Sequence, residues 1–317
     1  INSGKTITGT KDNQIGIKGL YGFEYEFVPN DMNYNRGTID MKGSNSIGAY
    51  GTASNFDNRG KISVDKNSVA VYWSAESEFD YGLLGPSAPI PHNSARNDGE
   101  ILLGENSTGM YATDSGTTGE NTGKITLSGE NTTGMGAADS ATITNKNEIS
   151  GTVKNVIGMY GKGSGTNVTN MKNINLSKEN STGIFTKDDA VAKNETGANI
   201  NLEEKNSVGI FGLASAASKK IDLTNNGTVT LKGEGSTGIF ASNAESATGS
   251  GIYSGSVANS SIKNTGTITL DAEKTVGIYT PKSTISKVGN ITMTKNANSS
   301  VAVYLTQEAT ADGTGAV

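Results

Sequence analysis

Ser207-Val208-Gly209-Ile210-Phe211 decides the fold, because variants of this phrase recur along the whole 317-residue chain. A small residue occupies the centre of each copy: Gly16, Gly48, Ala70, Gly109, Gly134, Gly158, Gly183, Gly209, Gly238, Gly277 and Ala302. Repetition at this interval is typical of solenoids. We therefore interpret the chain as a repeat protein before considering any single motif.

The residues on either side of the central position are mostly β-branched or apolar, as in Val208 and Ile210. Side chains two apart point to the same face of a strand, and the residue between them points to the other face. We therefore expect a short strand with both flanking side chains inward and the small residue outward.

A second phrase, Asn-x-Gly-x-Ile-x-Leu, precedes most copies, for example at residues 35–41, 97–103 and 225–231. Because Asn and Gly tolerate left-handed backbone, we expect them to form a tight corner before a second strand. A looser third stretch occurs at residues 141–145, 219–225, 260–264 and 283–287. Three short strands per turn, stacked about 4.8 Å apart, predict a right-handed parallel β-helix of about eleven turns and roughly 50 Å.

Composition narrows the possible functions. There is no cysteine, so a disulfide framework, a thiolate metal site and a thiol nucleophile are excluded. The net charge of -5 argues against nucleic acid as a partner. We find no stretch long and apolar enough to insert in a membrane and no signal peptide, and we expect a single β-helical segment, 1–317, excerpted from a longer protein.

The phrases Asn180-Ser181-Thr182-Gly183-Ile184-Phe185 and Asn206 to Phe211 resemble the passenger repeats of the large autotransporter adhesins of fusobacteria. The resemblance covers essentially the whole chain. It implies a type V secreted protein on the bacterial cell surface, anchored in the outer membrane by a C-terminal β-barrel outside these residues. It also implies binding to a host protein receptor, a galactose-type glycan or a partner bacterium. The galactose-sensitive host adhesin that engages immune receptors is the nearest resemblance.

Three units are longer than the others. Seven of the ten intervals between central residues are 22 to 29 residues, whereas one is 32 and two are 39. The extra residues follow the central phrase, so we place insertions at 20–34, 73–97 and 241–258 on one arc of the rod. Insertions on one face of a solenoid commonly form its binding surface.

The first two insertions carry our candidate ligand-binding residues. In the first, aromatic residues alternate with acids, and an amphipathic strand whose rings pack on the rod is an alternative. The second contains the only Trp and the only His of the chain. A ligand-binding loop and a loop that only covers a local cavity are equal alternatives for it. The third is polar, and we expect a flexible loop. The candidates are Trp73, Glu76, Glu78, Phe79, Asp80, Tyr81, His92, Arg96, Tyr21, Tyr25, Glu24 and Glu26.

Two columns of the repeat have structural interpretations. Nine aromatic residues lie two positions after the central residue, for example Tyr72 and Phe211, and we expect their rings to stack between turns rather than to bind a ligand. A recurring Asn precedes the central phrase, at Asn45, Asn67, Asn106, Asn131, Asn155, Asn180 and Asn206. We predict that these Asn side chains form a hydrogen-bonded ladder.

Catalysis is not indicated. Enzymes that act on polysaccharides need clustered carboxylates on adjacent turns, and the acids here are scattered over corners. No calcium repeat or phosphate loop is present, so no metal and no cofactor is expected. We conclude that the chain is a non-enzymatic adhesin segment. The alternatives are a structural spacer with the binding site elsewhere and, third, a polysaccharide-active enzyme.

Overall fold

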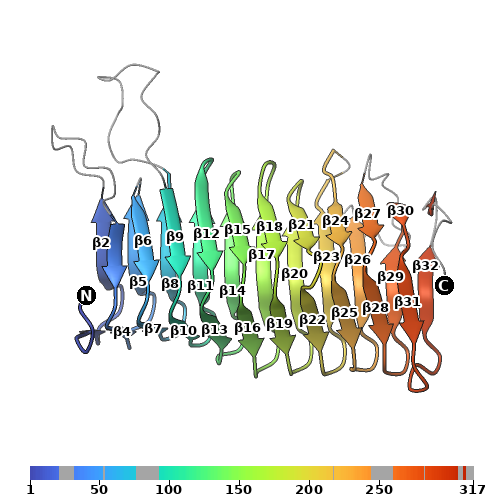
Figure 1. Ribbon diagram of the computed structural model, residues 1–317, viewed down its shortest axis with the longest axis horizontal. Helices are drawn as coiled ribbons and strands as arrows, with labels where there is room; N and C mark the ends of the chain where they lie inside the picture. Colours follow the sequence, from blue (N-terminus) through green and yellow to red (C-terminus); the bar gives the residue numbers. More distant parts are fainter. Residues whose placement is uncertain are drawn as a thin grey trace, which may run out of the picture.

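The protein is an all-β parallel solenoid. The computed structural model describes residues 1–20, 32–52, 54–75, 93–216, 218–243, 260–281, 283–305 and 310–311. Within these ranges there are strands and corners but no helix. The strands form three parallel sheets of eleven strands each, stacked into a rod with the two chain ends at opposite ends (Figure 1).

The three sheets follow one another in every turn, and we name them A, B and C. Sheet A contains the Ile-x-Leu part of the second phrase in β1 (Thr6–Gly9), β4 (Thr38–Met41), β7 (Lys61–Val64), β10 (Glu100–Leu103), β13 (Lys124–Leu127), β16 (Glu148–Gly151), β19 (Asn173–Leu176), β22 (Asn199–Leu202), β25 (Thr228–Leu231), β28 (Thr267–Leu270) and β31 (Asn290–Met293).

Sheet B contains all eleven copies of the central phrase, one in each strand. Its strands are β2 (Ile15–Leu20), β5 (Ile47–Thr52), β8 (Val69–Ser74), β11 (Thr108–Thr113), β14 (Thr133–Ala138), β17 (Ile157–Lys162), β20 (Thr182–Lys187), β23 (Val208–Ala214), β26 (Thr237–Asn243), β29 (Val276–Thr280) and β32 (Val301–Leu305).

Sheet C is formed by the third stretch of each turn, as the sequence predicts. Its strands are β3 (Met32–Asn35), β6 (Asn55–Asn58), β9 (Asn93–Asn97), β12 (Thr117–Asn121), β15 (Thr142–Asn145), β18 (Asn167–Asn170), β21 (Val191–Asn194), β24 (Asp222–Asn225), β27 (Ser261–Asn264), β30 (Thr284–Lys287) and β33 (Thr310–Ala311).

One expectation about sheet B is wrong. The central Gly faces the interior, and the residue before it is only half-buried. The register pairs Val208 with Thr237 and Ile210 with Ile239 but omits Gly209, so the strand bends there. A Cβ atom on Gly209 would lie 2.5 Å from the carbonyl oxygen of Gly238. The position is small because the next turn passes too close for a larger side chain.

A continuous apolar core runs along the axis. Each sheet contributes an inward column in register with its neighbours, such as Ile174 in sheet A, Ile184 in sheet B and Val168 in sheet C, all fully buried. Burying such a side chain stabilises the fold by about 1.5–3 kcal/mol. A single turn has no second layer to pack on, so this stabilisation depends on stacking.

A buried Asn ladder joins the turns, but in a different column from the predicted one. Its members are the last residues of their sheet C strands, and all are fully buried; six of the nine begin an Asn-x-Gly phrase, and Asn145, Asn170 and Asn194 do not. Each Nδ2 donates to the Oδ1 of the next turn at 2.7–2.8 Å, through Asn35, Asn58, Asn97, Asn121, Asn145, Asn170, Asn194, Asn225 and Asn264.

The column that we predicted as the ladder has another role. Asn45, Asn67 and the equivalent Asn residues adopt left-handed backbone, with φ of 55–59°. Side-chain bonds from Asn106 to Asn67 and from Asn131 to Asn106 are exposed. These residues are therefore the left-handed corners.

The corner between sheets C and A is also formed differently from our expectation. The glycines of its Asn-x-Gly copies do not have positive φ, whereas Gly197 and Gly289 at the same corner do. In an Asn-x-Gly copy, a Cβ atom on Gly60 would lie 2.0 Å from the carbonyl oxygen of Gly37. Close approach of neighbouring turns, and not left-handed backbone, requires glycine in these Asn-x-Gly copies.

The strand register shows that the three insertions are shorter than the sequence predicted. Leu20 and Met32 align with Thr52 and Asn55 of the next turn, so the first excursion is 21–31 and not 20–34. In the same way the strands include Trp73 and Ser74, Asn93–Asn97, and residues 241–243. The second and third excursions are therefore 75–92 and 244–260. Along the chain, each lies between a strand of sheet B and a strand of sheet C.

Candidate functional site

Trp73 belongs to the core, so its predicted role as a ligand-facing ring is wrong. The side chain is fully buried, and its ring stacks on Phe56 with the centroids 5.3 Å apart. The indole Nε1 donates to the carbonyl oxygen of Ser54 at 2.6 Å. The large ring fits because the neighbouring position is Gly51, where a Cβ atom would lie 2.2 Å from the indole.

Arg96 is the only other predicted site residue that the structure describes. It lies in β9, directly after the second excursion, and its side chain is 51% exposed. The remaining predicted residues fall outside the described part of the chain: Tyr21, Glu24, Tyr25, Glu26, Glu76, Glu78, Phe79, Asp80, Tyr81 and His92. Their role in binding stays a prediction.

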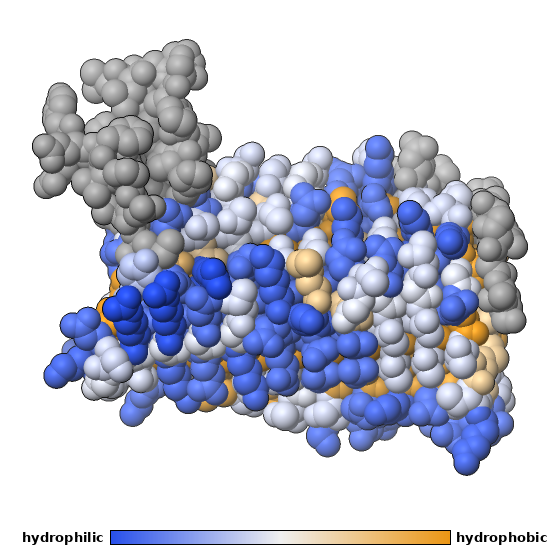
Figure 2. Space-filling view, viewed as in Figure 1, coloured by the Kyte–Doolittle hydropathy of each residue, from blue (hydrophilic) through white to orange (hydrophobic). Residues whose placement is uncertain are grey.

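The described residues place Arg96 in a cluster that the sequence analysis missed. The three arginines of the chain lie on the first three turns: Arg36 and Arg59 directly follow β3 and β6 at the corner between sheets C and A, and Arg96 is the last but one residue of β9. We define the arginine cluster as Tyr34, Arg36, Asp57, Arg59, Arg96 and Asp98. Strongly hydrophilic side chains gather over these N-terminal turns in Figure 2. The cluster is adjacent to β3 and β9, the strands that follow the first and second excursions.

Two guanidinium groups lie close to the ring of Tyr34. The Cζ of Arg36 is 5.2 Å from the ring centroid of Tyr34, and the Cζ of Arg59 is 4.6 Å from it. The ring is 37% exposed. Since the face of a tyrosine ring carries negative potential, it holds both cations in place. The register explains their proximity, because β3 and β6 are paired and Arg36 and Arg59 directly follow the paired Asn35 and Asn58.

Carboxylates orient two of the three arginines. Arg59 Nε donates to Asp57 Oδ2 at 2.6 Å, and Arg96 Nε donates to Asp98 Oδ1 at 2.6 Å. The side chain of Asp57 is only 4% exposed, and its Oδ1 is buried without a hydrogen bond. The hydrogen bond that Arg59 donates to Asp57 holds the pKa of Arg59 above its ordinary value. Both arginines are therefore held through Nε, and among the described residues no hydrogen bond uses their terminal nitrogens.

Arg36 has a different environment. Among the described residues, no carboxylate forms an ion pair with it, and its side chain is exposed. A planar guanidinium offers a fork of donors that matches the geometry of a carboxylate or sulfate. The cluster can therefore bind an oxyanion. A useful signal in the sequence was that Arg36 and Arg59 occupy the same place in the repeat, between Asn and Gly.

The aromatic column of sheet B stacks between turns, as predicted. Ring centroids of successive members are 4.8–5.7 Å apart from Tyr50 to Tyr111 and again from Tyr160 to Tyr304, with Gly136 between the two runs. Most pairs are nearly parallel, so each ring covers the face of its neighbour. A sugar that stacks on an aromatic face would have to displace one of these contacts.

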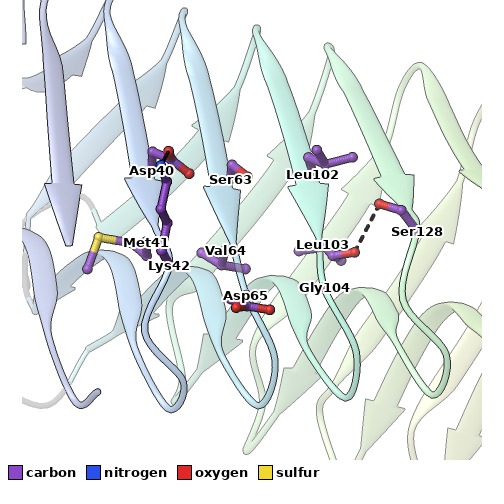
Figure 3. A pocket seen from close by; sticks show the side chains of 10 residues that line it. All are labelled: Asp40, Met41, Lys42, Ser63, Val64, Asp65, Leu102, Leu103, Gly104 and Ser128. Atoms are coloured by element: carbon purple, nitrogen blue, oxygen red, sulfur yellow. Dashed lines mark hydrogen bonds and ion pairs between the residues drawn. The ribbon is translucent and has the colours of Figure 1, made fainter. Parts of the chain in front are cut away.

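A shallow hollow of about 280 Å³ lies near the ends of four sheet A strands (Figure 3). Lys42 Nζ lies 3.5 Å from Asp40 Oδ2, and Leu102 contributes an apolar side chain. The hollow has no aromatic residue and no unpaired arginine, so we regard it as weaker than the arginine cluster. Its lining residues are Asp40, Met41, Lys42, Ser63, Val64, Asp65, Leu102, Leu103, Gly104 and Ser128.

The described ranges contain neither a metal-binding group of side chains nor a membrane-spanning helix. No three His, Cys, Asp or Glu side chains are grouped there in a way that could hold a metal ion. The same ranges contain no helix with the length and apolar character needed to cross a bilayer.

Comparison with known proteins gives one family. A family model described as the BigA third pectate lyase-like domain matches residues 1–148 and 183–314, which is most of the chain. No curated protein and no solved structure matches it.

Proposed function

The chain belongs to the family of the BigA third pectate lyase-like domain, a β-helix domain of bacterial surface proteins, and on that premise we propose that it is an adhesin segment. In this proposal a right-handed solenoid on the bacterial surface presents a binding face to a host protein receptor, a galactose-type glycan or a partner bacterium. Its parent protein is held at the outer membrane. The segment itself does not insert in the bilayer.

One observation carries the proposal: two long excursions leave the rod two turns apart, and their return strands carry an exposed cluster of guanidinium groups. The flanking strands β2 and β8 are separated by a single strand, β5, so the excursions are anchored about 10 Å apart. A rigid, registered core fixes these anchors. Long loops on a rigid scaffold are where binding residues concentrate.

We propose that the segment is not an enzyme, although its family is described as pectate lyase-like. The ion pairs support this interpretation, because the acids of the cluster are each neutralised by an arginine or lysine. Asp57 pairs with Arg59 and Asp98 pairs with Arg96, and the neighbouring Glu120 pairs with Lys146 at 2.5 Å. A general base needs a carboxylate that is free to accept a proton from substrate.

A spacer remains the second candidate, and the middle of the rod favours it. From β11 to β23 the corners between sheets B and C are short, and the sheet registers continue from turn to turn. Such a segment holds other parts of a protein at a fixed distance. The two candidates differ in whether the N-terminal excursions bind a partner.

The register supplies a test with a matched control. Ser74 aligns with Thr113, and Asn93 aligns with Thr117, so residues 75–92 can be replaced by Asp-Ser-Gly, the corner at 114–116. For the control, residues 244–260 are replaced by the seven-residue corner 215–221, because Asn243 aligns with Ala214 and Ser261 with Asp222.

Attachment of the labelled chain to host cells and to partner bacteria is then measured, with and without galactose. We expect the 75–92 replacement to lose attachment and the 244–260 replacement to retain it, with both variants folded by circular dichroism. Equal attachment by both variants and the unaltered chain would support the spacer. Release of sugar from a polysaccharide would overturn the non-enzymatic proposal.

A further inference from the structure

We propose that the arginine cluster binds the carboxylate or sulfate groups of an acidic polysaccharide. This inference rests on the proposed adhesin function and names a ligand class for it. The geometry of Arg36, Arg59 and Tyr34 carries the argument, and Arg96 extends the site by one turn.

The donors needed for an oxyanion are present and exposed. Arg59 and Arg96 use Nε for Asp57 and Asp98, and their side chains remain 43% and 51% exposed. Among the described residues, the terminal nitrogens of both arginines make no hydrogen bond. The two terminal nitrogens and their planar geometry are what bind a carboxylate or sulfate through two parallel hydrogen bonds.

The charge balance of the cluster favours an added anion. Arg36 and Arg59 follow paired residues of β3 and β6, so their backbones are about 4.8 Å apart. Both guanidinium groups contact the ring of Tyr34, and Asp57 neutralises only Arg59. Two like charges on neighbouring turns repel each other. An oxyanion between them would replace this repulsion with attraction on both sides.

Elsewhere on the described surface, some of the cations are paired with acids. The chain has a net charge of -5, and Lys61 pairs with Glu100 across turns of sheet A, as Lys232 pairs with Glu203. A protein of this charge does not bind polyanions through its overall field. Binding at moderate salt would therefore report a local site.

The surface suits a polysaccharide better than a peptide. A peptide could add to a sheet only at a free edge, and β6 is paired on one side with β3 and on the other with β9. The hollow described above lies along the other end of the sheet A strands, around Met41 and Leu103. In the described ranges the cluster thus offers hydrogen-bond donors and one exposed ring without an apolar groove, which suits a hydroxylated chain with acidic groups.

Surface plasmon resonance on immobilised polysaccharides tests the proposal with the full chain at about 0.15 M salt. Chondroitin sulfate carries sulfate and carboxylate, hyaluronan carries carboxylate alone, and dextran carries neither, so the three surfaces separate the sources of the oxyanion. The variants are Arg36→Gln, Arg59→Gln and Arg36→Lys. The control is Lys193→Gln, which removes an exposed cation from the same sheet in β21.

We expect binding to one or both acidic polysaccharides and none to dextran. Arg36→Gln and Arg59→Gln should each weaken binding roughly fivefold, Arg36→Lys should weaken it less, and Lys193→Gln should leave it unchanged. No binding to either acidic surface, or an equal loss in Lys193→Gln, would overturn the inference. Equal competition by a polyglutamate peptide would also overturn it, because the site would then be selective for charge and not for sugar.

The cell assay separates this inference from the adhesin proposal. If the chain attaches to cells and Arg36→Gln attaches equally well, the adhesin proposal stands and the polysaccharide inference fails. If the unaltered chain binds neither cells nor partner bacteria, the adhesin proposal fails. If the chain nevertheless binds an acidic polysaccharide surface, the proposal that the arginine cluster binds oxyanions is supported although the adhesin proposal fails.

Discussion

Replacing Asn145 with alanine should destabilise the rod far more than an equivalent change on the surface. Asn145 is fully buried and holds the ladder on both sides. Its Oδ1 accepts from Asn121 Nδ2 at 2.8 Å, and its Nδ2 donates to Asn170 Oδ1 at 2.8 Å and to the carbonyl oxygen of Asn147 at 3.0 Å. The substitution breaks all three bonds.

The magnitude follows from the partners that remain. Asn121 loses an acceptor and Asn170 loses a donor, and both amides are fully buried, so water does not replace the missing bonds. Each unsatisfied buried group costs about 1–3 kcal/mol, which gives a loss of about 2–6 kcal/mol in the free energy of unfolding.

Asn201→Ala is the matched control. Asn201 Nδ2 also donates to an Asn of the neighbouring turn, Asn175 Oδ1, at 2.8 Å, but on the outer face of sheet A. Water can take over this bond, so we expect a loss of about 1 kcal/mol or less. The difference between the two variants isolates the effect of burial.

Urea denaturation is the assay, followed by circular dichroism and by the fluorescence of Trp73, the only tryptophan. Coincident transitions test whether the rod unfolds as one unit, which repeat proteins do not always do. If the transitions separate, amide exchange in β12, β15 and β18 measures the local loss. Equal destabilisation by Asn145→Ala and Asn201→Ala would refute the reasoning.

Three further predictions concern the core, the central glycine and an exposed carboxylate. Trp73→Ala should cost about 3–5 kcal/mol in thermal unfolding, because it empties a closed site, and an unchanged Tm would contradict the burial. Gly183→Val should cost about 1–3 kcal/mol or more, since a Cβ atom there lies 2.5 Å from the carbonyl oxygen of Gly209, whereas Gly197→Ala has free space and should cost about 1 kcal/mol from its left-handed φ. Hydrogen bonds from Thr294 and Asn296 lower the pKa of Asp271 below its ordinary value of 3.8. Its stabilisation is therefore present above pH 3.8 and lost as the pH falls through the lower folded value, so amide exchange at residues 294–300 should differ between the unaltered chain and Asp271→Asn at pH 7, and the difference should shrink as the pH falls below 3.8.

The strands could be predicted from the sequence because alternation and period are local properties. Each copy of the central phrase falls in its own strand of sheet B, and the third stretch forms sheet C. The Asn columns could not be assigned in this way. Asn45 and Asn58 both recur once per turn, but Asn45 has left-handed backbone and Asn58 points into the core. The direction of a corner side chain depends on how turns stack, and one turn of sequence does not contain that information.

The candidate site was harder to predict for a related reason. Trp73 was selected because it is rare, but its position depends on the size of its neighbours, Gly51 and Ala95, which the register brings beside it and Phe56. Arg36 and Arg59 are 23 residues apart in sequence and become neighbours through the register. In a solenoid, residues at the same place in the repeat lie side by side, so a rare residue type that recurs there is a better signal than a rare residue alone.

The long excursions follow from how each corner is fixed. The corner between sheets C and A is fixed by the Asn ladder and by the close approach of Gly37 and Gly60. The corner between sheets A and B is fixed by serine hydroxyls that accept from the next backbone, as when Ser46 N donates to Ser68 Oγ at 3.0 Å. Most corners between sheets C and A have two residues and one, 195–198, has four, whereas corners between sheets A and B have four to seven residues. Apart from the three long excursions, the corners between sheets B and C range from two residues at 53–54 to seven at 215–221. All three long excursions lie at this corner, where extra chain adds only a small loop-closure cost, so this is the corner at which the fold accepts an added segment.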